Sequence, residues 1–348
     1  MGFTRVFSTS LLLTISTNTF IVFALCSFLL VGCGQDKIAL NNQAATSVGE
    51  PVLDAKFSGD AASILFLNHA QQVKIWSLNT NQIDVILPED KLPKPARQVE
   101  YSKDGSIALV IGENDVAIFR VQPLEYIGKL RMQGISPLAR ITASALSENK
   151  LKFVAGMEDG AINMAQLDTG INNQFQPHRQ LVSHIQLTNN GDVVYSGSLD
   201  GQIARWQFGE PKAIYSNMYQ HRITSLALNK SADRVFVSDG LHEQQILDAE
   251  SGDVIVKLDY ISRFKPFREA YFDESGKLLM TTSSKSQITF WDLKSGKEIG
   301  VWSCQTMKDG ATVLAITQPD KTHMMTVNTD GLIETWNLTP LLDSVDKE

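Results

Sequence analysis

Five residues between positions 178 and 206 have the side chains of a hydrolase active site. His178, Ser196 and Asp200 are the residue types of a Ser-His-Asp set, in which the histidine activates the serine hydroxyl and the carboxylate orients the histidine. Ser198 and Trp206 lie in the same stretch. Other chemistry is poorly represented in the sequence. The six histidines never fall into a ligand spacing with cysteine, and glycine-rich phosphate loops and calcium-loop spacings are absent. We therefore expect no metal and no cofactor.

The segment that carries these residues is one of seven similar units. From Tyr195 to Trp206 it reads as a strand, an Asp-Gly turn and a second strand. Equivalent positions recur every 41 to 46 residues, at Trp76, Phe119, Ala165, Trp206, Leu247, Trp291 and Trp336. A second marker, the apolar residue that closes a strand before a polar turn, recurs at Phe57, Tyr101, Leu146, Leu187, Leu228, Phe272 and Ile316. Because both markers keep the same phase, the sequence indicates a repeat protein with about four strands per unit.

The repeat resembles the WD-repeat family. Trp291-Asp292 is the signature dipeptide of that family, and Trp336-Asn337 and Trp76-Ser77 approximate it. The resemblance covers residues 51–338 and implies an all-β fold, a seven-bladed β-propeller of WD-repeat type with four-stranded antiparallel blades. It also implies a structural hydrogen-bond network, not catalysis, for five residues. These are His178, Ser196, Ser198, Asp200 and Trp206. We therefore expect that the protein is not an enzyme.

The N-terminal residues read as an export signal. No charged side chain occurs from Val6 to Gln35, and the apolar run ends in Leu30-Val31-Gly32-Cys33, which resembles the lipobox of bacterial lipoproteins. The resemblance implies removal of residues 1–32 and attachment of lipid to Cys33, and Gly34 points to the outer membrane. A retained transmembrane anchor is the alternative, because the run is long enough to cross a bilayer as a helix.

Two further segments flank the repeats. Residues 33–50 would hold the lipidated cysteine, a tether and a ring-closing strand near Lys37–Leu40, because the last unit lacks a fourth strand. Residues 339–348 would form an acidic C-terminal tail. After removal of the signal, Cys304 is the lone thiol besides the lipid site, so we expect no internal disulfide and interpret Cys304 as a buried apolar residue.

The distribution of charge suggests where a partner binds. A net charge of −7 argues against nucleic acid. The segments between units nevertheless carry eleven basic and four acidic residues, which predicts a basic face around the channel mouth. Cations and aromatics alternate in one such loop, and exposed residues of these types favour interfaces. The partner-binding candidates are Arg263, Phe264, Lys265, Phe267 and Arg268. Alternatively, both phenylalanines pack onto the blade.

The sequence thus favours a non-catalytic, lipid-anchored, monomeric propeller that serves as a protein-interaction scaffold. Its partner would be a protein or complex of the bacterial envelope, with the propeller on the outer membrane facing the periplasm. One alternative is a binder of a small anionic ligand or envelope polymer at the basic channel mouth. The other is a propeller-type enzyme, which would need convergent acids or histidines at that mouth.

Overall fold

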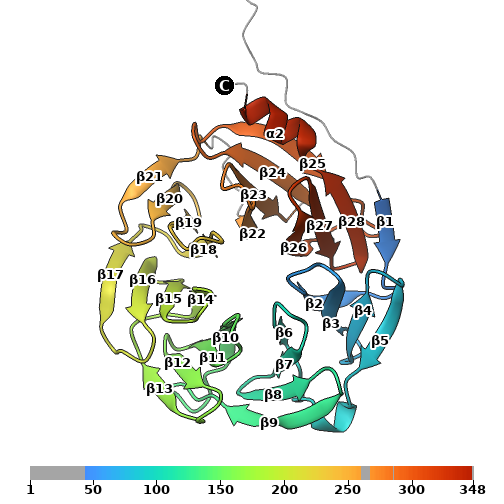
Figure 1. The fold of residues 1–348 in the computed structure, drawn as a ribbon. Coiled ribbons are helices and arrows are strands. Elements are labelled where there is room, and N and C mark those ends of the chain that lie inside the picture. Colours follow the sequence, from blue (N-terminus) through green and yellow to red (C-terminus); the bar gives the residue numbers. More distant parts are fainter. Residues whose placement is uncertain (1–43, 260–266, 285, 347–348) are drawn as a thin grey trace, which may run out of the picture. The chain divides into compact units, whose positions relative to one another are not determined.

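Seven four-stranded antiparallel sheets form a ring in the computed structural model (Figure 1). The structure describes residues 44–259, 267–284 and 286–346, all of which belong to one unit, Lys37–Glu348. Each sheet is one blade. The seven-bladed all-β propeller predicted from the repeats is confirmed.

In six blades the strands follow the chain from the inner to the outer edge, and in the seventh the first described strand of the chain forms the outer edge. Blade 1 is β2 (Val52–Phe57), β3 (Ser63–Asn68), β4 (Val73–Ser77) and β5 (Gln82–Ile86). Blade 2 is β6 (Gln98–Tyr101), β7 (Ile107–Ile111), β8 (Asp115–Arg120) and β9 (Glu125–Arg131). Blade 3 is β10 (Ile141–Leu146), β11 (Lys152–Met157), β12 (Ile162–Gln166) and β13 (Asn172–Phe175). Blade 4 is β14 (Val182–Leu187), β15 (Val193–Ser198), β16 (Gln202–Gln207) and β17 (Ala213–Met218).

The remaining blades have the same plan. Blade 5 is β18 (Ile223–Leu228), β19 (Arg234–Asp239), β20 (Gln244–Asp248) and β21 (Val254–Lys257). Blade 6 is β22 (Phe267–Phe272), β23 (Leu278–Ser283), β24 (Gln287–Asp292) and β25 (Glu298–Ser303). Blade 7 is β26 (Val313–Asp320), β27 (His323–Asn328), β28 (Leu332–Asn337) and β1 (Ala44–Ser47). A short 3-10 helix, η1 (Glu89–Lys91), lies between blades 1 and 2.

Both sequence markers lie where the repeat placed them. The Trp206 series lies in the third strand of every blade and is buried, whereas the Phe57 series lies in the first strand and ends it in all blades except the last. The second strands are almost entirely buried. The outer strands are mostly exposed or half-buried, with alternation in β9 and β17 and with the buried Trp302 in β25 as an exception. The hydrophobic core is therefore divided among the junctions between blades. Seven separate apolar clusters each join two neighbouring blades.

The N-terminal strand β1 closes the ring. It pairs antiparallel with β28, from Ala44 opposite Thr335 to Ser47 opposite Leu332. The sequence placed this strand near Lys37–Leu40, a segment that lies outside the described residues. The chain then turns into blade 1, where the Glu50 carboxylate accepts hydrogen bonds from Lys74 Nζ (2.7 Å) and Asn68 Nδ2 (2.6 Å). Both ends of the repeat region therefore meet at the junction of blades 7 and 1.

Gly331 is expected to be needed at this junction. Its φ is +77°, its carbonyl accepts a hydrogen bond from Val48 N at 3.0 Å, and an added Cβ would lie 2.3 Å from the Glu50 carbonyl oxygen. Gly310 has φ +86° but open space around its Cα. Left-handed backbone costs an alanine roughly 1–2 kcal/mol at either position, and only Gly331→Ala adds a steric clash. We expect Gly331→Ala to lower the free energy of unfolding clearly more than Gly310→Ala in denaturant titrations. An equal loss of stability in both variants would contradict the close approach of Gly331 to the Glu50 carbonyl oxygen.

The C-terminal residues differ from the predicted acidic tail. Thr339–Val345 form a helix, α2, with Pro340 in its first turn, where the missing N–H is not needed. Leu341 is fully buried in the core cluster that also holds Trp302 and Trp336, whose rings stack at 5.0 Å. The apolar face of α2 thus adds to the core of blades 6 and 7. Among the described residues, no helix has the length and apolarity needed to cross a membrane.

Candidate interaction face and central channel

The serine and histidine of blade 4 belong to a buried hydrogen-bond network. Ser196 Oγ lies 2.8 Å from His178 Nε2 and accepts a hydrogen bond from Trp206 Nε1 at 2.9 Å. On the other side of the imidazole ring, His178 Nδ1 faces Asp200 Oδ2 at 3.5 Å. Ser196 is completely buried, so no substrate can reach its hydroxyl.

Protonation in this network follows from burial and from backbone donors. Burial lowers the pKa of His178, and the Asp200 carboxylate opposes that change in part. Burial alone would raise the pKa of Asp200. The N–H groups of Arg179 and Gln202 donate to its carboxylate oxygens, however, and the pKa of Asp200 is therefore lower than its usual value. Ser198 Oγ donates to the Gln180 carbonyl (3.1 Å). The network therefore fixes the loop that enters blade 4.

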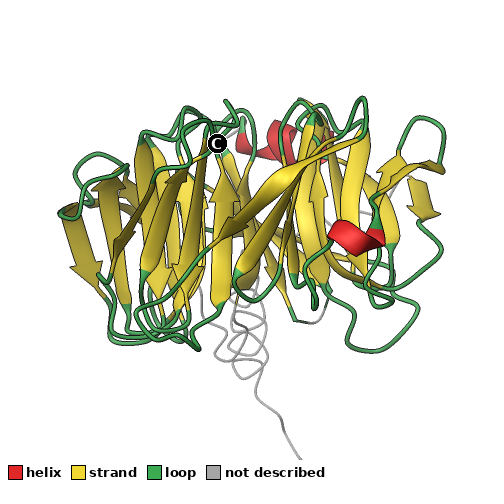
Figure 2. Ribbon diagram, turned by 90° about the horizontal axis from the view of Figure 1, so that it is seen from below, coloured by secondary structure: helices red, strands yellow, loops and turns green. Residues whose placement is uncertain are grey.

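One face of the ring is formed by the loops between blades and the turns between second and third strands, and we call it the loop face. Loops gather at the two rims of the ring (Figure 2). The turn side chains hold the neighbouring loop by its backbone. Asp159 Oδ2 accepts from Ser136 N (2.7 Å), Asp330 Oδ2 from Met307 N (2.6 Å), and Asn114 Nδ2 donates to the Ala139 carbonyl (2.7 Å). These loops are thus held in place before any partner binds.

The loop face is not the strongly basic surface that the inter-blade segments predicted. The turns between second and third strands lie on the same face and carry six carboxylates against one lysine, Lys285, which is outside the described residues. The carboxylates are Glu113, Glu158, Asp159, Asp200, Glu243 and Asp330. The excess of seven positive charges therefore falls to two. Arg97 pairs with Glu113 at 2.8 Å and Arg140 with Glu158 at 3.1 Å.

The predicted partner-binding loop is only partly described. Arg263, Phe264 and Lys265 lie outside the described residues, as does Cys33. Phe267 is 2% exposed and packs between the rings of Phe236 and Trp291, each with centroids 6.0 Å away. The prediction that Phe267 contacts a partner is therefore wrong, because this ring anchors β22 in the core.

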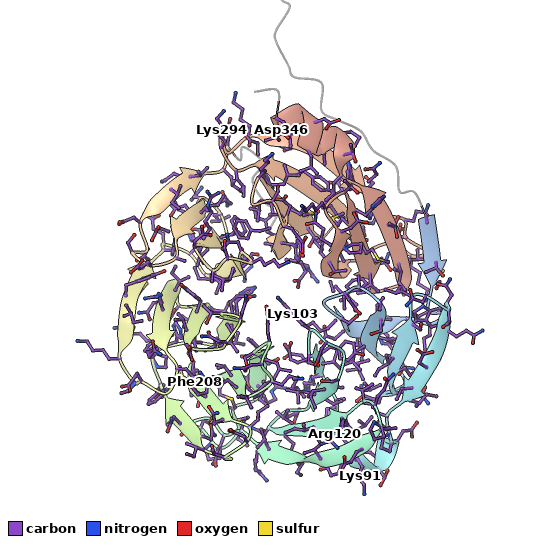
Figure 3. All side chains as sticks on the ribbon, in the orientation of Figure 1. Lys91, Lys103, Arg120, Phe208, Lys294 and Asp346 are labelled. Carbon is purple, nitrogen blue, oxygen red and sulfur yellow. The ribbon has the colours of Figure 1, made fainter. Side chains whose placement is uncertain are left out.

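Arg268, the last of those candidates, lines the central channel. The inner strands of the blades enclose it, and Figure 3 shows Lys103 at its inner rim. A cavity of about 720 Å³ opens at the face opposite the loop face, and a smaller one of about 220 Å³ lies deeper. Five charged residues line the smaller cavity, namely Asp54, Lys56, Glu100, Arg268 and Glu269. Three carboxylates against two cations make this channel slightly acidic, which contradicts the predicted basic channel mouth among the described residues.

The pKa values of the channel carboxyl groups are raised above their ordinary values. Burial raises the pKa of Asp54 and of Glu100, with Lys56 opposing both changes. Glu269 is exposed to the channel, but desolvation by the surrounding strands raises its pKa to about 7, with Lys56 opposing this change and the charges of Asp54 and Glu100 adding to it. Glu100 in turn raises the pKa of Lys56, whose Nζ lies 3.9 Å from its carboxylate. The Lys56 side chain is 41% exposed and Arg268 and Glu269 are exposed, so solvent in the channel reaches this ionic cluster.

Glu269→Gln is expected to stabilise the protein increasingly as pH rises from about 4.5 to 7, with a constant gain above pH 7. The folded-state pKa of about 7 lies above the ordinary value of 4.5, so ionised Glu269 destabilises the fold above pH 7. That destabilisation declines as pH falls from 7 and is absent below about 4.5. The melting temperature of the variant should therefore exceed that of the wild type above pH 7 and match it at acid pH. Glu125→Gln on the outer strand β9 is the control. A pH-independent difference would refute the assignment.

Sequence reasoning missed the channel residues apart from Arg268. The signal was a charged residue in the first strand of blades 1, 2 and 6, whereas the positions equivalent to Lys56 and Glu100 in blades 3, 4 and 5 are Ala145, Gln186 and Ala227. One periodic marker lies in the third strands and the other closes the first strands, and neither coincides with a charged residue of the channel. Cys304 is buried as predicted, and burial raises the pKa of its thiol. No cluster of His, Cys, Asp or Glu suited to a metal occurs in the part of the chain that the structure describes.

Comparison with known proteins supports the architecture. No family model matches the chain. A chain in the crystal structure of the Mitotic Checkpoint Complex matches it with a TM-score of 0.71, covering 96% of this chain and 98% of that one at 15% identity. The fold is a WD-repeat β-propeller. Apoptotic protease-activating factor 1 from Homo sapiens is 21% identical over 81% of this chain, and its Mus musculus counterpart is 26% identical over 49%.

The WD-repeat propeller corresponds to a minor part of these relatives. The matched region covers 25% of the human protein and 13% of the mouse protein. The likeness therefore concerns the propeller and not the remaining length of either relative.

The buried hydrogen-bond network of blade 4 has counterparts in other blades, where Trp291 and Trp336 donate to Thr281 (2.8 Å) and Thr326 (3.2 Å).

Proposed function

We propose that this propeller is a non-catalytic scaffold that binds a protein through its loop face. The observation that carries the proposal is a set of large apolar side chains exposed on loops whose backbone is fixed. Leu138 is 85% exposed, and Ile135, in the same loop, and Met307 are also exposed. Neighbouring blades hold this loop through Asn114, Asp159 and other polar side chains. Exposed apolar anchors on a preorganised loop favour binding, since little flexibility is lost on association.

The similar solved chain comes from a protein complex, which supports protein partners for this propeller. A scaffold also agrees with the chemistry of blade 4, where the Ser196–His178 pair is sealed inside the blade. The small anionic ligand considered from the sequence loses its support, because the cations of the loop face and channel are largely matched by carboxylates.

We further propose that lipid on Cys33 holds the propeller at a bacterial envelope membrane, with the outer membrane favoured by Gly34. The support is the sequence Leu30-Val31-Gly32-Cys33. Residues 34–43 separate Cys33 from β1 and can span at most roughly 35 Å when extended. The propeller would therefore stay near the bilayer, and its partner would be an envelope protein or complex.

The scaffold proposal is tested by partner capture with matched leucine variants. Leu138→Ser removes an anchor from the loop face, whereas Leu151→Ser removes a 40%-exposed leucine from a turn on the opposite face. We expect Leu138→Ser to abolish co-purification of the partner without changing the melting temperature, and Leu151→Ser to leave co-purification intact. Equal capture by both variants would contradict the proposal.

The anchor is tested separately by cell fractionation. The wild-type protein should sediment with membranes, and Cys33→Ala should lose lipid attachment. A Cys33→Ala protein released into the soluble fraction, or retained only through an uncleaved signal, would agree with lipidation of Cys33. Mature wild-type protein without lipid, shown by mass spectrometry, would refute it.

A further inference from the structure

A polar cavity of about 380 Å³ lies on the loop face at the junction of blades 4 and 5. Tyr219, Asp239, Glu243 and Gln245 are among the residues that line it. It occurs where blade 5 departs from the pattern of blade 4. Register places Asp239 at the position of Ser198 and Leu247 at that of Trp206. The buried network of blade 4 therefore has no equivalent here, and a polar cavity is found at this junction.

Asp239 is the most unusual group in this cavity. Its side chain is 1% exposed, and Oδ1 accepts three backbone hydrogen bonds, from Leu241 N (2.9 Å), His242 N (2.7 Å) and Glu243 N (2.9 Å). Its second oxygen, Oδ2, is buried and has no hydrogen-bond partner among the described residues. A buried carboxylate oxygen without a donor is unfavourable, so this position calls for a donor that the chain itself does not supply.

The other acceptors around the cavity are already oriented. Gln245 Nε2 donates to Glu243 Oε2, and Tyr219 Oη donates to Gln245 Oε1 at 3.2 Å. Lys257 Nζ, on the outer strand β21, lies 3.1 Å from Glu243 Oε2, but its side chain is 62% exposed. Two carboxylates thus face one weakly held lysine, and the cavity keeps an excess of negative charge.

We propose that this cavity binds the guanidinium or ammonium group of a basic side chain from the protein partner. The inference rests on the proposed scaffold function and names the partner chemistry at one point of the loop face. A cation supplies the missing donor to Asp239 and a charge partner to Glu243, and the cavity volume suits one long side chain. Met218, exposed at the rim, offers an apolar surface for the aliphatic stem of that side chain.

The test is a titration of the full chain in detergent with N-acetyl-arginine amide, followed by NMR chemical shifts. N-acetyl-citrulline amide has the same shape without the charge, and its affinity should be lower than that of N-acetyl-arginine amide by about tenfold or more. Glu243→Gln should weaken arginine binding severalfold, and Lys257→Gln, which removes the competing cation, should strengthen it. Glu158→Gln, on the equivalent turn of blade 3, should change nothing.

Three outcomes would overturn the cation site. These are no arginine binding at millimolar concentration, equal binding of citrulline, and an affinity unchanged by both Glu243→Gln and Lys257→Gln. The probe is a small molecule, so the result does not depend on the protein partner. Arginine binding without partner capture would contradict the scaffold function and support the cation site. Partner capture without arginine binding would support the scaffold function and contradict the cation site.

Discussion

Replacing β1 (Ala44–Ser47) by a Gly-Ser segment of equal length is expected to lower the melting temperature by roughly 10 °C or more. The four residue pairs between β1 and β28 contribute about 1 kcal/mol per hydrogen bond. Loss of β1 also frees the chain that leads into blade 1 and weakens the apolar cluster joining blades 7 and 1, which contains Val48 and Val52. Thermal unfolding followed by circular dichroism measures the effect.

The matched control is the same replacement in β13, the outer strand of blade 3. It also forms four residue pairs, with β12, but it closes no ring. Phe175 of β13 packs on the core, so the control loses some apolar contact as well. We nevertheless expect the β13 variant to be clearly the more stable of the two. If the β1 variant melts at the same temperature as the control or above it, ring closure by β1 does not stabilise this propeller.

Ser196→Ala is expected to lower the free energy of unfolding by about 2–3 kcal/mol. The change leaves two buried groups, Trp206 Nε1 and His178 Nε2, without the hydroxyl that each contacts within 3 Å. A buried donor without an acceptor keeps the full desolvation penalty. Denaturant titration of the wild type and the variant gives this difference directly.

Ser225→Ala is the control for Ser196→Ala. Ser225 lies in β18, is 1% exposed, and its Oγ has no hydrogen-bond partner among the residues described. Removing this hydroxyl should change stability little or raise it, because a desolvated polar atom is lost with no bond broken. Equal effects of the two alanine variants would contradict the structural role of the blade 4 network.

The blade number could be predicted from sequence because each blade repeats the same burial constraint. Trp206 and Leu247 differ chemically, yet both fill the third-strand position between blades, and spacing alone reveals this. Phe267 could not be assigned in the same way. Cations and aromatics alternate in the same way whether the aromatic ring faces a partner or the core. The structure shows that β22 starts at Phe267 and that this ring is buried in the core.

Charge was harder to predict than fold because pairing depends on residues distant in sequence. Arg140 counts as a free cation in its own segment, but Glu158 approaches it from the turn of the next blade. The same holds for the cavity of blade 5, where Asp239 and Tyr219 come from different blades. The marker series places Leu247 where blade 4 has Trp206, but it does not indicate that the neighbouring turn of blade 5 lines a cavity.

Site-specific photo-crosslinking in membranes tests the scaffold function most directly. A photoreactive amino acid is placed either at Leu138 on the loop face or at Leu151 on the opposite face, both of which are exposed. We predict a discrete protein adduct from position 138 and none from position 151. Adducts of the same protein from position 151 alone, or no adduct from position 138 in cells that contain the intact propeller, would contradict binding through the loop face.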